Sequence, residues 1–277
     1  MPEALDKPSA SIHPEDDTPM TVLEHLGELR TRLIRALLGV LPGMCLAWQY
    51  RDYLLEFLFT PYAQAYVKLG LGKPVMHFSN PPELFMVQMK VSIVAGLMLA
   101  SPWVFFQIWM FIAPGLYKRE RRFAVPFVVS STVCFAVGAF FAYKQFMGPM
   151  YLALLGMGGP LPGASMNIQP MMMITENVSF ATQVLLAFGV VFEVPVVVTF
   201  LALAGIVNWR QLLKFGRWWV VISSLLAAVL TPTADAFSMM LMMAPLIILY
   251  YLAVGLAYLF GPKPEAEAKP EDEQQAV

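Results

Sequence analysis

Charged and thiol side chains are scarce in this sequence. Only 13% of its 277 residues are Asp, Glu, Lys or Arg, 58% are hydrophobic, and the formal net charge is -1. So few polar side chains cannot cover one or two soluble domains, and the absence of a basic surplus gives no indication of nucleic-acid binding. The sequence has 2 cysteines and 3 histidines, and none stands at metal-ligand spacing. We therefore expect Cys45 and Cys134 to be apolar packing residues and expect no metal site.

Catalytic motifs are missing as well. The histidines His13, His25 and His77 all lie outside the long apolar segments. There is no Gly-x-Ser-x-Gly, His-Glu-x-x-His or phosphate-binding glycine loop, and no nucleophile–base or aspartate pair within an apolar segment. The sequence thus predicts a protein that is not an enzyme and has no cofactor.

Long apolar runs dominate what is present. A helix rising 1.5 Å per residue needs about 20 apolar residues to cross a hydrocarbon layer about 30 Å thick. Six segments reach or approach that length: 33–50, 84–106, 123–143, 178–203, 215–230 and 237–260. The fifth, at about 16 residues, is short for a full crossing and implies thinning, tilt or shelter inside the protein. The predicted fold is an all-α integral membrane protein with about six transmembrane helices.

The distribution of cations orients these spans. Of the 18 Lys and Arg residues, 13 fall on the side of the termini. The other 5 are Arg51, Lys68, Lys73, Lys90 and Lys144. By the positive-inside rule both termini are cytoplasmic, and an even number of spans agrees.

The ends of the chain differ from its middle. Residues 1–19 contain no basic segment followed by an apolar core, so no cleavable signal peptide is visible. Residues 261–277 are rich in Pro, Glu, Lys and Gln and have almost nothing to bury. We predict disordered cytoplasmic tails at 1–19 and 261–277 around a membrane domain at 20–260.

Two outer loops are long enough to carry structure of their own. Residues 51–70 mix apolar and charged side chains at near-helical spacing, which predicts a helix that lies on or caps the outer face. Residues 144–175 are rich in Gly, Pro and Met, and we predict irregular structure packed over the helices there.

Glu193 is the polar residue that most needs explanation, because it lies near the middle of the fourth span. A charge there costs about 2.5 to 3.5 kcal/mol on insertion scales. It could relieve the carbonyl freed by Pro195, or it could form a functional polar site. For Lys90 we expect snorkelling outward or a pair with Glu83, and for Asp235 a cap on the sixth helix.

Two more carboxylates lie on the cytoplasmic side. Pro114 and Gly115 end the second apolar segment, and Glu120 follows among four cations in the next few residues. Residues 21–35 form an amphipathic helix pattern in which Glu28 and Arg32 are four apart, a spacing worth about 0.2 to 0.5 kcal/mol. Taken alone, both carboxylates are explained as solvated charges that neutralise their neighbours.

Four motifs in order support a more specific interpretation. They are HLGELRTRL at 25–33, SPWVFFQIWMFIAPGLYKRERR at 101–122, FGVVFEVP at 188–195 and the Thr231-Pro232 turn. Together they resemble the C subunit of the twin-arginine protein translocase, over almost the whole of residues 23–260.

That resemblance implies a fold, a location and a function. The helices would form a curved, glove-like arrangement with a periplasmic cap, in the lipid of the bacterial cytoplasmic (inner) membrane. The protein would be the receptor and core subunit that binds twin-arginine signal peptides at its cytoplasmic face. With single-span partner subunits, further copies of itself and the proton-motive force, it would help move folded proteins across the membrane.

The resemblance also implies roles for individual residues. Glu28 and Glu120 would supply carboxylates for the two arginines of the signal, since carboxylates and guanidiniums form charge-assisted forks. The remaining signal-peptide residues would be Arg30, Phe111 and Leu116. Polar groups within the membrane or in contact with partners would be Gln107, Glu193, Thr231 and Asp235, and Pro61 would belong to the outer cap.

The chain departs from the family pattern near the sixth span. Asp235 comes one residue later than in many members, Met239 stands where glutamine is frequent, and Tyr251 replaces a common glutamate. A proton-coupled small-molecule transporter is the alternative, because a lone intramembrane carboxylate such as Glu193 also suits proton coupling. A purely structural membrane scaffold is the third.

Overall fold

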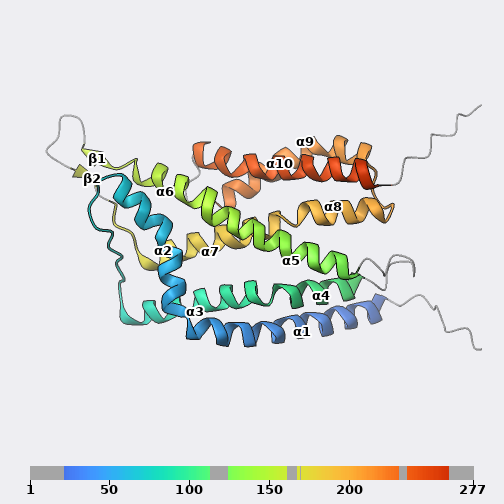
Figure 1. Ribbon diagram of the computed structural model, residues 1–277, viewed down its shortest axis with the longest axis horizontal. Helices are drawn as coiled ribbons and strands as arrows, with labels where there is room; N and C mark the ends of the chain where they lie inside the picture. The colour runs from blue at the N-terminus through green and yellow to red at the C-terminus, as the bar shows by residue number, and fades with distance from the viewer. Residues whose placement is uncertain (1–21, 113–123, 161–166, 169, 231–235, 262–277) are drawn as a thin grey trace, which may run out of the picture.

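The structure is a computed structural model that describes residues 22–112, 124–160, 167–168, 170–230 and 236–261 (Figure 1). The predicted tails therefore lie outside the described residues, apart from Gly261. The helices and strands, in chain order, are α1 (Val22–Gln49), α2 (Arg51–Lys68), α3 (Pro81–Leu99), α4 (Ser101–Ile112), α5 (Ala124–Phe141), the π-helical turn η3 (Ala142–Phe146), α6 (Met147–Leu155), β1 (Gly159–Pro160), β2 (Asn167–Ile168), α7 (Ile174–Val191), α8 (Val194–Leu203), α9 (Trp209–Leu230) and α10 (Ala236–Phe260).

Among the described residues, six helical segments are long and apolar enough to cross a membrane, as the sequence predicted. One expectation about them is wrong. The fifth span is not short, because α9 has 22 residues and begins at Trp209. Arg210 and Lys214 interrupt the apolar run in the first turns of α9, so the run alone begins only at residue 215. A helix end at the membrane surface accommodates such cations.

Prolines divide two of the spans into consecutive helices. Pro102 follows the junction of α3 and α4 at Ala100, and Pro195 follows the junction of α7 and α8. A proline has no N–H for the carbonyl four residues earlier and its ring crowds that carbonyl, so the helix bends or restarts. The second break leaves Glu193 between α7 and α8.

The third span is longer than predicted and includes the first part of the predicted second outer loop. After α5, the turn η3 and α6 continue the helix to Leu155. Irregular structure was therefore the wrong prediction for residues 144–155. The side chains of Met147, Met150 and Tyr151 are fully buried there, and this burial outweighs the weak helix propensity of Gly148 and Pro149.

The spans stand side by side in an open row. The span α3–α4 packs on α1, α5 packs on α4 and α7, and α10 packs on α8 and α9. The two ends of the row, α1 and α9, lie on opposite edges of the molecule (Figure 1). Helix α1 begins and α10 ends at the same end of the molecule, which fits an even number of crossings.

The two ends of the spans have different characters. Helix α2, the predicted capping helix, lies across one end, which we call the cap end (Figure 1). There Asn80 caps α3, and the Glu83 carboxylate accepts hydrogen bonds from the Ser79 N–H and the Thr175 hydroxyl, both at 2.6 Å. The opposite end, where α1 and α9 begin, we call the basic end. Its described cations in those first turns are Arg30, Arg32, Arg35, Arg210, Lys214 and Arg217.

Candidate functional site

Small residues let α1 lie close against the second span. A Cβ atom added to Gly96 would stand 2.5 Å from the Met44 backbone nitrogen, and one added to Gly43 would stand 2.6 Å from the Gly96 carbonyl oxygen. Real Cβ contacts are not so short. The two backbones therefore touch in a way that requires glycine, as small residues commonly permit between membrane helices.

A tryptophan fixes the same pair of helices nearer the basic end. The Trp103 indole ring occupies the space that a side chain at Gly39 would need, and its N–H donates to the Arg35 carbonyl at 2.9 Å. These contacts hold the first turns of α1 at a set position relative to α4.

The first turn of α1 also meets the last turn of α4 directly. The rings of His25 and Phe111 stack with centroids 4.4 Å apart and planes 18° from parallel. Phe111, a predicted signal-peptide residue, is thus packed on His25, which was not predicted as a site residue. The stack joins α1 to the point from which the chain continues into residues 113–123.

Glu28 lies on the same face of α1 as His25, because residues three apart are neighbours on a helix. Its Oε1 accepts from Arg32 Nε at 3.4 Å and Nη2 at 3.2 Å, and the two side chains are 19% and 20% exposed. Its Oε2 is buried with no hydrogen-bond partner. A carboxylate oxygen left in this state is costly, and a donor that reached it would stabilise the site.

The structure brings only some of the predicted signal-peptide residues together. Arg30 is exposed, and residues two apart on a helix do not face each other, so it points away from Glu28. The positions of Leu116, Glu120, Thr231 and Asp235 lie outside the described residues.

The two predicted polar residues inside the spans are largely enclosed by protein. Gln107 is 3% exposed, and its Oε1 is buried without a hydrogen-bond partner. Glu193 is half-buried, and its Oε1 is likewise buried without a hydrogen-bond partner. The buried Ser131 hydroxyl on α5 lies beside the Glu193 carboxyl. No described hydrogen bond joins Glu193 to the carbonyl that Pro195 frees, so that structural explanation receives no support.

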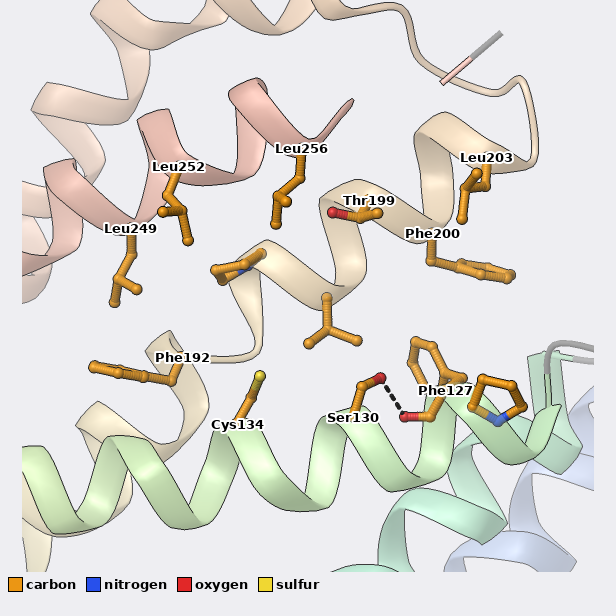
Figure 2. Close-up of a pocket in the computed structure, with 13 residues that line it drawn as sticks. Phe127, Ser130, Cys134, Phe192, Thr199, Phe200, Leu203, Leu249, Leu252 and Leu256 are labelled. Atoms are coloured by element: carbon orange, nitrogen blue, oxygen red, sulfur yellow. Dashed lines mark hydrogen bonds between the residues drawn. The ribbon is translucent and has the colours of Figure 1, made fainter. Parts of the chain in front are cut away.

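A cavity of about 540 Å³ opens next to Glu193, between α5, α8 and α10. Figure 2 shows Cys134 and Phe127 on one wall and Leu249, Leu252 and Leu256 on the other. Phe192 and Pro195 line it, but Glu193 does not. The lining carries no carboxylate, so this hollow is an apolar surface rather than an ion site.

Pro61 is buried within α2 and explains a contact at the cap end. Because Pro61 lacks an N–H, the Phe57 carbonyl loses its helical donor. The Tyr143 hydroxyl donates to that carbonyl at 2.9 Å, and the Tyr143 and Phe57 rings stack at 4.0 Å. Tyr143 thereby ties the cap to the third span, a role that the sequence did not reveal.

One further expectation is corrected at the cap end. Lys90 does not pair with Glu83, whose carboxylate is occupied by Ser79 and Thr175. Its Nζ donates instead to the Ser179 hydroxyl at 2.8 Å. Within the described ranges, no group of three or more His, Cys, Asp or Glu side chains could hold a metal ion.

Comparisons with known proteins assign the family. A model of the Sec-independent protein translocase protein (TatC) family matches residues 24–245. The Sec-independent protein translocase protein TatC of Koribacter versatilis is 37% identical over 260 residues, covering 92% of each chain. That of Desulforapulum autotrophicum is 37% identical over 263 residues, covering 95% of this chain and 91% of its own.

Solved structures agree in fold. A crystal structure of the twin-arginine translocase receptor TatC superposes with a TM-score of 0.70 at 30% identity and covers 85% of this chain and 99% of that one. A second, in the detergent DDM, gives 0.73 at 31% identity, covering 84% and 99%. These matches confirm the predicted all-helical membrane fold, and none of them favours a small-molecule transporter. The chain belongs to the TatC family of Sec-independent protein translocase proteins.

Proposed function

We propose that this chain is the receptor and core subunit of a twin-arginine translocase and that it binds the signal peptide at its basic end. It would catalyse no reaction itself. The observation that carries the proposal is the state of Glu28, whose Oε1 is held by Arg32 while its buried Oε2 has no partner. A signal arginine would satisfy that oxygen.

The chemistry of the guanidinium supports arginine over lysine as the ligand. A guanidinium presents five N–H donors in a rigid planar fork, whereas an ammonium is a compact point charge. Glu120, which follows α4 in the chain, would supply the second carboxylate for the second arginine. The His25–Phe111 stack links the helix that carries Glu28 to the helix that leads to Glu120 and Leu116.

We further propose that the basic end faces the cytoplasm of the bacterial inner membrane. The excess of 13 cations over 5 supports this orientation. Single-span partner subunits and further copies of the chain would pack against the spans, and the proton-motive force would drive export. Gln107, Glu193, Thr231 and Asp235 would supply polar contacts within the membrane, and Pro61 would shape the periplasmic cap.

Neutralising Glu28 tests the proposed site. Glu28→Gln keeps the size of the side chain and removes its charge, and Glu176→Gln, at an exposed position of α7 near the cap end, is the matched control. A charged hydrogen bond is worth about 1.5 to 3 kcal/mol, so we expect binding of a twin-arginine signal peptide to weaken about ten- to a hundredfold in Glu28→Gln only. Equal binding by both variants, with unchanged thermal melting, would remove Glu28 from the site.

A further inference from the structure

Two cavities meet beneath the cap helix α2. One, of about 390 Å³, lies between α2, α3, α5 and α7. The other, of about 440 Å³, lies between α1, α2 and α3. They share Leu54, Ala95 and Met98 as lining residues. The two cavities therefore adjoin along these residues, and we call them together the cap-end groove.

The lining of the cap-end groove is almost entirely apolar. Its few hydroxyls are largely committed, since Tyr143 donates to the Phe57 carbonyl and Thr182 donates to the Val178 carbonyl. The groove lies within the helices that span the membrane, so hydrocarbon and not water is its natural contents. Its two parts fall in the size range of small-molecule sites, about 300 to 1,000 Å³.

Two lysines give the groove a positive rim. Lys144, on η3, lines the smaller of the two cavities and is exposed. Lys90 is half-buried on α3, one turn before the lining residue Val94. It lines neither cavity itself, and its described hydrogen bond goes to the neutral hydroxyl of Ser179, one turn before the lining residue Thr182. Neither lysine has a carboxylate within ion-pair distance among the described residues. The one ion pair in that part of the chain joins Arg32 and Glu28.

Two carboxylates at this end have other partners. Asp52 accepts from Gln88 at 3.3 Å, and Glu83 is occupied by Ser79 and Thr175. An unpaired cation within a span is costly, and such residues normally find an anionic partner. An apolar groove with two uncompensated cations at its rim is complementary to a molecule with an anionic head and hydrocarbon tails.

We propose that the cap-end groove binds one anionic phospholipid, with its acyl chains in the two cavities and its phosphate against Lys144 and Lys90. A cation beside an apolar groove attracts an anionic headgroup electrostatically. A peptide helix fits less well. A helix about 10 Å across fills roughly 420 Å³ per 5.4 Å turn, so each cavity would hold about one turn. Flexible acyl chains can instead follow a bent groove under α2.

Lipid retention by the purified full-length chain tests this proposal. The protein is delipidated in detergent and titrated with phosphatidylglycerol, and bound lipid is counted by native mass spectrometry. We expect one phosphatidylglycerol per chain at low lipid concentration, at least tenfold tighter binding than phosphatidylcholine, and a higher melting temperature with phosphatidylglycerol bound. Inorganic phosphate alone should produce neither effect.

Matched variants locate the site. Lys144→Gln should weaken phosphatidylglycerol binding at least fivefold, whereas Lys68→Gln, which removes an exposed α2 lysine outside the groove, should leave it unchanged. Ala95→Leu, at the shared wall, should weaken both phospholipids without changing charge. Equal affinities for the two phospholipids, or equal effects of Lys144→Gln and Lys68→Gln, would overturn the proposal. So would cross-linking from position 95 to a signal peptide or partner helix in chains that retain no lipid.

Discussion

Removing the Tyr143 hydroxyl should destabilise the packing of α2 on the third span, because Pro61 in α2 leaves the Phe57 carbonyl without another donor. Tyr143→Phe keeps the ring that stacks on Phe57 and deletes only the donor to the Phe57 carbonyl. In most helices that carbonyl would still hold its own N–H partner. Here the partner position is Pro61, which has no N–H, so the carbonyl is left with no donor.

The expected change in the free energy of unfolding is large because the Phe57 carbonyl has no other donor. Hydrogen bonds between membrane helices average about 0.6 kcal/mol, with a maximum near 1.7 kcal/mol, because the same groups also find partners in the unfolded state within the membrane. A buried polar group with no replacement costs about 1 to 3 kcal/mol. We therefore expect Tyr143→Phe to lower the free energy of unfolding by about 1 to 2 kcal/mol.

A double-mutant cycle with Pro61→Ala isolates the cause. An alanine at position 61 would restore the N–H that can bond the Phe57 carbonyl, so Tyr143→Phe should cost about 0.5 kcal/mol or less in that background. Tyr62→Phe on α2 is the matched control. The Tyr62 hydroxyl is buried without a hydrogen-bond partner, so its removal should be neutral or stabilising.

Reversible unfolding in mixed micelles, followed by circular dichroism, measures these differences. The reasoning is refuted if Tyr143→Phe costs the same with proline and with alanine at position 61, or if Tyr62→Phe is as destabilising as Tyr143→Phe.

Two further predictions concern packing and capping. Gly96→Ala should lower the melting temperature by several degrees, because its Cβ would meet the Met44 backbone at 2.5 Å. Gly27→Ala, whose Cβ meets nothing within 4 Å, should leave the melting temperature unchanged or raise it slightly, because alanine favours a helix over glycine. Equal melting of both variants would contradict the close approach of α1 and α3. Glu83→Gln should weaken the bonds from Ser79 and Thr175 and so loosen the starts of α3 and α7. Hydrogen exchange should then quicken in the first turns of both helices, and unchanged exchange there would count against this contact.

The sequence was sufficient for features that depend on local pattern. Apolar run length predicted the six spans, near-helical spacing predicted α2, and the separation of Glu28 and Arg32 anticipated an ion pair that forms. The break beside Glu193 also follows from a local cause, the proline two residues later.

The missed features depend on contacts between distant residues. Tyr143 and Phe57 are 86 positions apart, and Trp103 and Arg35 are 68 positions apart. Neither pair leaves a periodic signal in the sequence. The helix α6 was missed for a related reason, because burial of its side chains in the core outweighs the composition of the segment. A proline within a helix is the one clue available, since it indicates a carbonyl that needs a donor from elsewhere.

Recognition of the arginine pair is the central claim, and one binding measurement tests it most directly. A twin-arginine signal peptide and a twin-lysine peptide would be titrated against the detergent-solubilised wild type and against Glu120→Lys, with thermal melting to verify the fold. We predict that the wild type prefers the arginine peptide and that Glu120→Lys loses this preference while remaining folded. A wild type that never distinguishes the two peptides, even with its single-span partners added, would contradict the account.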